Sequence, residues 1–199
     1  MGDKTDALKQ WIKTTGDKNI ALIPNAMDIY PDGERKDESI QGSMDELSEL
    51  GFDVAILDLR DYFGKEPELA VELEKYHTVF ARGGNAFALR LAMKLSGFDN
   101  FLKSKKGDDD FLYGGYSAGI CVQGPTMHGL ELVDDATAKP YGDYGIEWNG
   151  LGLLDFVPVP HFDSDHPESE LINEVVNYLE KHDIPYKTLR DGDVIVKII

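Results

Sequence analysis

Short, nearly continuous runs of hydrophobic residues alternate along this chain with segments of helical periodicity. The hydrophobic runs predict buried strands over 19–24, 53–59, 77–81, 111–114 and 156–159. Apolar stripes at helical spacing predict helices over 5–14, 37–50, 66–76, 86–95 and 167–181. Near the end, residues 186–190 and 194–199 flank an Asp-Gly-Asp turn and are expected to form a hairpin.

This alternation of strand and helix predicts the fold class. Strands that are hydrophobic on both faces are typical of parallel sheets covered by helices on either side. We therefore expect an α/β three-layer sandwich with a mainly parallel central sheet, in a single domain over residues 1–199. In such a sheet, ligands bind beyond the carboxyl ends of the strands.

A serine flanked by glycines lies at one of these strand ends. Residues 115–119 read Gly-Tyr-Ser-Ala-Gly and follow the strand predicted over 111–114, with Ser117 at the centre. The pattern Gly-x-Ser-x-Gly is typical of a nucleophile elbow, a sharp turn from strand to helix that exposes the serine hydroxyl. Because a glycine-rich chain also produces this pattern by chance, the interpretation depends on the residues that accompany it.

A serine nucleophile needs a base, and the base needs an acid that orients it. His161 has the best position for the base, because it follows the strand predicted over 156–159 and so shares the sheet edge with Ser117. The acid candidates are Asp134, Asp135, Asp155 and Asp191. Spacing leaves this choice open. The position of Asp191, in the turn after the last predicted strand, favours it.

A second glycine-rich turn offers donors for an oxyanion. Residues 82–85 read Arg-Gly-Gly-Asn and join the strand over 77–81 to the helix over 86–95. Glycines allow backbone N–H groups to approach a ligand, and a helix N-terminus stabilises negative charge. The N–H groups of Gly84 and Ala118 therefore form a candidate oxyanion hole.

Composition excludes several classes of function. The net charge of −17 argues against nucleic acids and anionic membranes as partners. No apolar run reaches the length of about 18 residues that a membrane span needs, and the first residues lack the apolar core of a signal peptide. These features favour a cytoplasmic protein. Cys121 is the only cysteine and is expected to face the core, so no intrachain disulfide forms.

A metal centre is not expected either. The acidic and histidine residues at 161, 163, 165 and 166 match no familiar metal-ligand spacing, and a metal there would occupy His161, the proposed base. The chemistry proposed for Ser117 requires neither a metal nor an organic cofactor.

Four motifs in order resemble the serine peptidase family of dipeptidase E (aspartyl dipeptidase) and cyanophycinase. They are residues 82–87 (Arg-Gly-Gly-Asn-Ala-Phe), 115–119, 160–162 (Pro-His-Phe) and 189–192 (Leu-Arg-Asp-Gly). The resemblance extends from about residue 20 to the C-terminus. It implies a fold like that of class I glutamine amidotransferases, with serine in place of their cysteine. Carried over by position, it implies Ser117 as nucleophile, His161 as base and Asp191 as acid, with oxyanion donors at Gly83 or Gly84 and at Ala118.

The chain departs from the family pattern at three places. Arg82 and Ala86 replace the first glycine and the threonine of the loop motif. The family usually begins with a strand before its first helix, whereas this chain starts at that helix, so the first family strand is expected to be missing. The helix over 167–181 contains no arginine, although dipeptidase E is thought to recognise the substrate aspartate through one there. Arg82 and Asn85 are therefore the candidate substrate contacts.

The leading hypothesis is a serine peptidase, specifically a dipeptidase, that hydrolyses small peptides. One alternative keeps the serine chemistry but acts as an esterase or amidase on a non-peptide acyl group. The other is a non-enzymatic binding or regulatory member of the same fold. A missing strand would leave a sheet edge open to self-association, so we expect a monomer or a homodimer.

Overall fold

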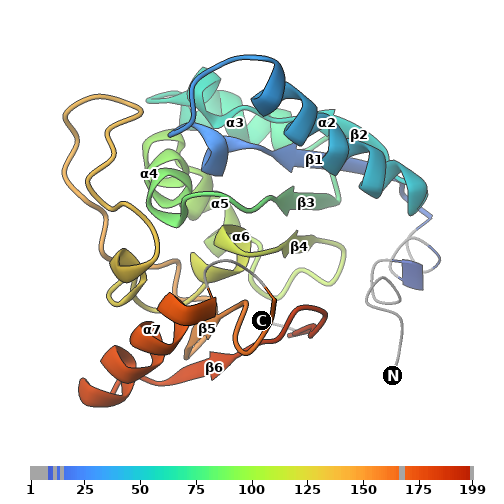
Figure 1. Cartoon of the computed structure of the whole chain (residues 1–199). Helices are drawn as coiled ribbons and strands as arrows, with labels where there is room; N and C mark the ends of the chain where they lie inside the picture. Colours follow the sequence, from blue (N-terminus) through green and yellow to red (C-terminus); the bar gives the residue numbers. More distant parts are fainter. Residues whose placement is uncertain (1–8, 11–12, 14–15, 166–168, 198–199) are drawn as a thin grey trace.

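The computed structural model in Figure 1 describes residues 9–10, 13, 16–165 and 169–197. At its centre is a four-stranded sheet in the order β2-β1-β3-β4, in which neighbouring strands are parallel. The strands are β1 (Asn19–Ile23), β2 (Asp53–Ile56), β3 (Thr78–Ala81) and β4 (Leu112–Gly115). The prediction of an α/β fold with a mainly parallel central sheet is confirmed.

Helices follow the strands along the chain. They are α2 (Glu34–Glu49), α3 (Glu66–Leu73), α4 (Ala86–Ser96), α5 (Phe98–Ser104), α6 (Ala118–Cys121) and α7 (Ser169–Lys181), with 3-10 turns η1 (Asn25–Met27), η2 (Leu59–Tyr62) and η3 (Leu130–Leu132). Four of these helices, α2, α3, α4 and α7, confirm predictions from the sequence. The helix predicted over 5–14 lies largely outside the described residues. Among the helices that are described, none is long and apolar enough to cross a membrane.

Two hydrophobic layers hold the central sheet between helices. On one face, Leu47 of α2 packs with Ile20 of β1. On the other face, Leu89 of α4 packs with Val79 of β3. All four side chains are at most 4% exposed. Because successive side chains of a strand point to opposite faces, a continuous hydrophobic run supplies both layers at once.

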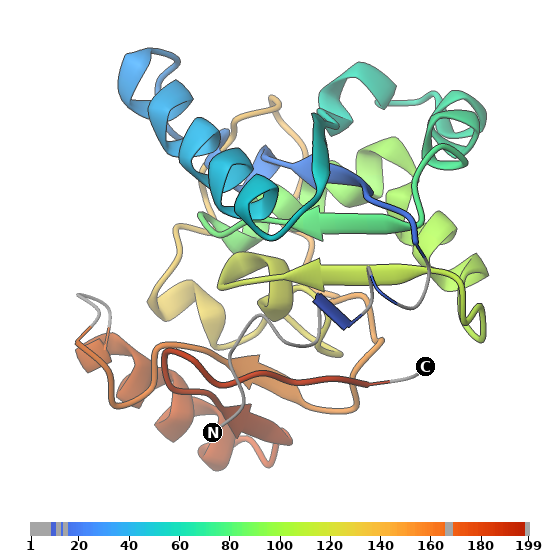
Figure 2. The ribbon, with the colours of Figure 1, turned by 90° about the vertical axis from the view of Figure 1, so that its right-hand side faces the viewer.

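A second, two-stranded sheet lies beyond β4. It pairs β5 (Val157–Val159) with β6 (Tyr186–Thr188) in parallel. In Figure 2 these orange and red strands lie below β4. The hairpin predicted over 186–199 is wrong. Helix α7 returns the chain so that β6 pairs with β5 in the same direction, and residues 194–197 form no strand.

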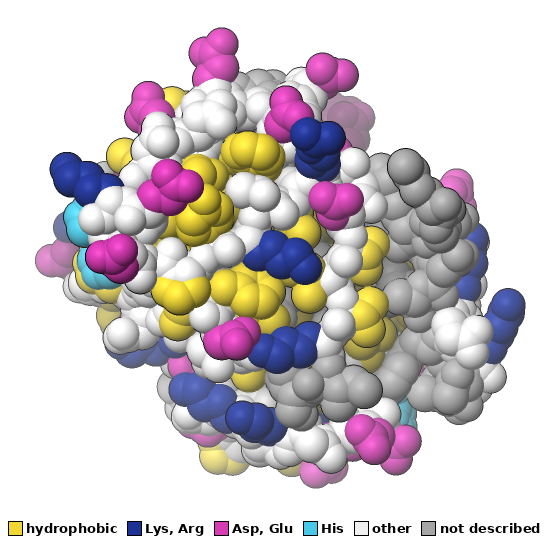
Figure 3. Space-filling model, turned by 90° about the horizontal axis from the view of Figure 1, so that it is seen from below, with side chains coloured by type: hydrophobic (Ala, Val, Ile, Leu, Met, Phe, Trp, Pro, Cys, Tyr) yellow, Lys and Arg dark blue, Asp and Glu magenta, His cyan; other side chains and the backbone are white. Residues whose placement is uncertain are grey.

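Figure 3 views the molecule from below, from the end that carries α7 and the second sheet. Hydrophobic side chains near the centre of this face are interleaved with charged ones. Leu171 of α7 and Val194, which follows β6, are among the large hydrophobic residues that remain exposed. Scattered hydrophobic side chains of this kind are ordinary on a protein surface and do not by themselves define a binding site.

The turn from β4 into α6 is packed so closely against β3 that it requires glycine. A Cβ atom on Gly119 would lie 2.1 Å from the carbonyl oxygen of Ala81, and one on Gly115 would lie 2.9 Å from the same atom. The obstacle is backbone, which cannot rotate away as a side chain can. The first and last glycines of the Gly-x-Ser-x-Gly motif therefore serve the contact between α6 and the sheet.

Replacing Gly119 by alanine should destabilise the protein, because the new methyl group forces α6 away from β3. We expect a loss of about 1–3 kcal/mol in the free energy of unfolding, equivalent to about 2–4 °C in melting temperature per kcal/mol for a chain of this length. Calorimetry would measure the change.

Gly42→Ala is the matched control, because Gly42 lies within α2, where an added Cβ would meet no neighbouring atom within 4 Å. That change should be neutral or stabilising, by up to about 1 kcal/mol. Equal melting temperatures for Gly119→Ala and wild type would contradict the packing argument.

Candidate active site

The strand-end residues that the sequence singled out meet at the carboxyl side of the two sheets. Ser117 follows β4, and His161 follows β5. Both residues line one small pocket. The pocket is completed by Ala118, Cys121, Leu130, Val133, Asp134, Val159, Pro160 and Ile172. Cys121 also belongs to the hydrophobic core, as predicted.

Ser117 adopts a backbone conformation that few residues other than glycine adopt. Its φ is 49° and its ψ is −117°. Such a conformation costs of order 1–3 kcal/mol and persists only where surrounding contacts impose it. The first turn of α6 supplies such contacts, because the carbonyl oxygen of Ser117 accepts hydrogen bonds from the N–H groups of Ile120 and Cys121, both 3.0 Å long. The Tyr113 hydroxyl adds a bond of 2.8 Å to the Gly119 carbonyl. Ser117 therefore lies in a strained turn between β4 and α6.

His161 is paired with Asp191. Its Nδ1 lies 2.8 Å from Oδ1 of Asp191, and the histidine side chain is 15% exposed. The parallel pairing of β5 and β6 continues past the strands through a hydrogen bond of 3.0 Å from the Phe162 N–H to the Leu189 carbonyl. The two strand ends are thereby held side by side. In a neutral imidazole whose Nδ1–H donates to the carboxylate, Nε2 is the basic nitrogen.

The other acid candidates have different contacts. Oδ2 of Asp134 accepts the Ala86 N–H at 2.8 Å, at the start of α4, although Asp134 also lines the pocket. Oδ1 of Asp135 accepts the Thr137 N–H at 2.8 Å, and hydrogen bonds from Thr137 hold the pKa of Asp135 below its ordinary value. Asp155 pairs with Lys197 at 3.1 Å.

The glycine loop lies against the serine. A Cβ on Gly83 would be 3.0 Å from the Cβ of Ser117, so the two residues are in direct contact. Gly84 has a φ of 139°, which a residue with a side chain rarely adopts. Within the described part of the chain, the N–H groups of Gly83, Gly84 and Ala118 donate to no protein acceptor. These are the N–H groups that the sequence predicts as oxyanion donors.

Arg82 and Asn85, the two candidate substrate contacts, are both engaged with the fold. Arg82 is 6% exposed, and its Nη2 donates to the Ser39 hydroxyl of α2 at 3.0 Å. Its Nε and Nη1 atoms have no hydrogen-bond partner among the described residues. Asn85 caps α4, because its Oδ1 accepts the Ala88 N–H at 2.8 Å, and its Nδ2 donates to the Asp135 carbonyl at 3.1 Å.

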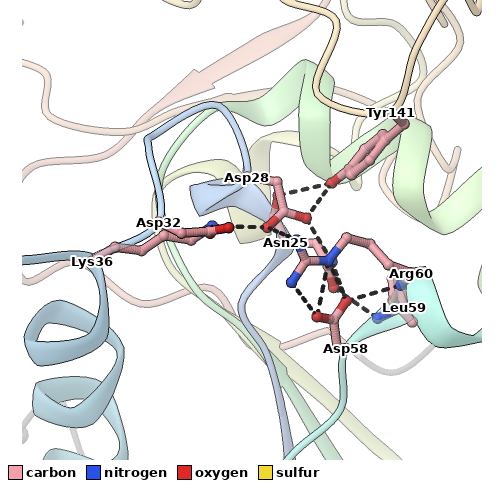
Figure 4. A network of polar contacts seen from close by, with 8 residues as sticks. All are labelled: Asn25, Asp28, Asp32, Lys36, Asp58, Leu59, Arg60 and Tyr141. Atoms are coloured by element: carbon pink, nitrogen blue, oxygen red, sulfur yellow. Dashed lines mark hydrogen bonds and ion pairs between the residues drawn. The ribbon is translucent and has the colours of Figure 1, made fainter. Parts of the chain in front are cut away.

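A polar network at the ends of β1 and β2 was not anticipated from the sequence. Figure 4 shows it around Asn25 and Asp28. Asn25, fully buried, donates from Nδ2 to Asp28 at 2.8 Å and to Asp58 at 2.9 Å. Burial alone would raise the pKa of Asp58, but hydrogen bonds from Arg60 and Asn25 outweigh it and hold the pKa below its ordinary value. Asn25 follows the strand predicted over 19–24, so the strand-end argument used for Ser117 would also have selected it. Asp58 falls within the strand predicted over 53–59, and only the observed end of β2 at Ile56 places it after a strand.

Comparison with known proteins supports this description of the fold. The chain superposes on a peptidase E candidate from Listeria monocytogenes EGD-e with a TM-score of 0.70 and 22% identity, covering 94% of this chain and 83% of that one. It superposes on a peptidase from an acI-B1 actinobacterium with a TM-score of 0.58 and 16% identity, covering 88% and 70% of the two chains. No curated protein matches the sequence.

A family model covers almost the whole chain. The model for peptidase family S51 matches residues 2–198, which include the elbow, the glycine loop and the His161 and Asp191 segments. Such a match supports a serine peptidase. On this evidence, the chain belongs to peptidase family S51.

Proposed function

We propose that the protein hydrolyses small peptides through a triad of Ser117, His161 and Asp191. The observation that carries the proposal is the distance of 2.8 Å between His161 Nδ1 and Asp191 Oδ1. His161 also lines the same pocket as Ser117, which has a strained backbone conformation. Membership of peptidase family S51 supports serine chemistry.

The proposed reaction follows from these positions. Ser117 Oγ attacks the peptide carbonyl carbon and gives its proton to Nε2 of His161, while Asp191 stabilises the imidazolium that forms. The negative oxygen of the tetrahedral intermediate accepts hydrogen bonds from the N–H of Ala118 and from the Gly83–Gly84 loop. His161 then protonates the leaving amine. Water, deprotonated by the same histidine, releases the acyl group and regenerates the serine.

A fluorophosphonate probe tests the nucleophile. We expect wild-type protein to be labelled at one site, because an activated serine hydroxyl attacks phosphorus and displaces fluoride. Ser117→Ala should not be labelled, and peptide mass spectrometry of the wild-type adduct should find the probe on Ser117. An unlabelled wild type, or equal labelling of the two proteins, would refute the assignment.

The choice of acid can be tested with two matched amide substitutions. Asp191→Asn should lower the second-order rate of labelling by roughly 10²–10⁴-fold, because the amide no longer holds His161 in the tautomer that leaves Nε2 basic. Asp134→Asn should cause a much smaller loss, since an amide oxygen can still accept the Ala86 N–H. Circular dichroism would check that both variants fold. The reverse order of effects would transfer the role to Asp134.

A further inference from the structure

The candidate oxyanion loop is held on one side by the turn after β1. The carbonyl oxygen of Ala26 accepts the Asn85 N–H at 2.8 Å. A Cβ on Gly84 would lie 2.5 Å from this same oxygen. The loop therefore rests directly on the Ala26 carbonyl, and the position of that carbonyl fixes the peptide planes around Gly84.

The same loop is held on its other side by the start of a long excursion, residues 134–149. Asp134 Oδ2 accepts the Ala86 N–H at 2.8 Å, and the Asp135 carbonyl accepts Nδ2 of Asn85 at 3.1 Å. The far end of the excursion is attached to the body of the protein through a hydrogen bond of 2.9 Å from the Met127 N–H to the Trp148 carbonyl. The Ala26 carbonyl and the Asp134–Asp135 segment must therefore keep their relative positions if the N–H groups of the glycine loop are to keep their direction.

Tyr141, in the middle of the excursion, joins these two supports. Its hydroxyl donates to Oδ2 of Asp28 at 2.7 Å and lies 3.2 Å from the Asn25 carbonyl oxygen (Figure 4). The Asp28 side chain is 3% exposed. Burial, reinforced by the bond to Asp28, raises the pKa of Tyr141 above its ordinary value, so the hydroxyl stays a donor at neutral pH. The Tyr141 ring packs edge-on against Phe63 with centroids 5.1 Å apart.

The contacts form a closed ring. It runs from the turn after β1 to the glycine loop, on to Asp134 and Asp135, along the excursion to Tyr141, and back to Asp28 beside Asn25. We propose that Tyr141 is a positioning residue for catalysis, whose hydroxyl closes this ring and so fixes the N–H groups of Gly83 and Gly84 against Ser117. This inference rests on the proposed function, because it assigns those N–H groups to the oxyanion hole.

The hydroxyl can be removed with little other change. Tyr141→Phe deletes one oxygen atom and keeps the ring against Phe63. Preorganised donors lose much of their effect when they move, and a misplacement of about 1 Å can cost up to about 10²-fold in rate. We therefore expect the maximal rate of fluorophosphonate labelling to fall by about ten-fold, with the concentration for half-maximal rate unchanged, because the probe binds before the oxyanion develops.

The experiment measures labelling rates against concentration of an alkyl fluorophosphonate, well below the melting temperature of each protein. Tyr144→Phe is the matched control, since Tyr144 lies on the same excursion with 51% of its surface exposed, and it should label like wild type. A merely structural role for Tyr141 would lower the melting temperature and leave the maximal labelling rate intact. A folded Tyr141→Phe that labels at the wild-type maximal rate overturns the inference.

A second variant cuts the ring elsewhere. Asn85→Asp removes the donor to the Asp135 carbonyl and places a carboxylate there, while an aspartate still caps α4 well. It should also lower the maximal labelling rate, and wild-type behaviour would overturn the inference even if Tyr141→Phe did not fold. A different result would refute the proposed function. In that case the wild-type protein would not be labelled, or Ser117→Ala would be labelled as much as wild type.

Discussion

The contact between Gly119 and the Ala81 carbonyl is the constraint on which the candidate site depends. No side chain fits there, since even a Cβ would lie 2.1 Å from the oxygen. Because α6 therefore starts in direct contact with β3, the chain must turn within a single residue, and Ser117 takes the positive φ of 49° that this turn demands. The strain places Ser117 against Gly83 and leaves the Ala118 N–H at the helix start. The strained serine and the Ala118 N–H at the start of α6 are thus consequences of one packing contact.

The remaining groups come from a different sheet. His161 and Asp191 are positioned by β5 and β6, which pair with each other, whereas Ser117 follows a strand of the central sheet. The turn after α6 meets β5 at another glycine, since a Cβ on Gly124 would lie 3.2 Å from the Cα of Val157. Close backbone packing at Gly119 and at Gly124 therefore sets the position of the histidine relative to the serine. Neither contact involves a charged group, so packing shape sets this relative position.

Much of this arrangement was predictable because it follows from strand ends. Hydrophobic runs located the strands of the central sheet and β5. The expectation that Ser117 and His161 share one sheet edge was wrong, because β5 pairs with β6 in a second sheet, and the two residues meet instead across one pocket. The prediction of a C-terminal hairpin was wrong because sequence periodicity does not reveal which strand β6 pairs with. Helix α7 brings β6 back beside β5, and the pairing is parallel. Tyr141 was missed for a related reason. It lies far along the chain from Asp28, in an excursion without periodic pattern, and its contact exists only in the folded molecule.

A crystal structure of the protein inactivated by a fluorophosphonate would show which groups hold the oxyanion, because the adduct mimics the tetrahedral intermediate. We expect a bond from phosphorus to Ser117 Oγ. We also expect the phosphoryl oxygen to lie about 2.7–3.1 Å from the Ala118 nitrogen and from a nitrogen of the Gly83–Gly84 loop, with His161 still paired to Asp191. An adduct on another residue, or a phosphoryl oxygen directed to solvent and away from both groups of donors, would contradict the proposed mechanism.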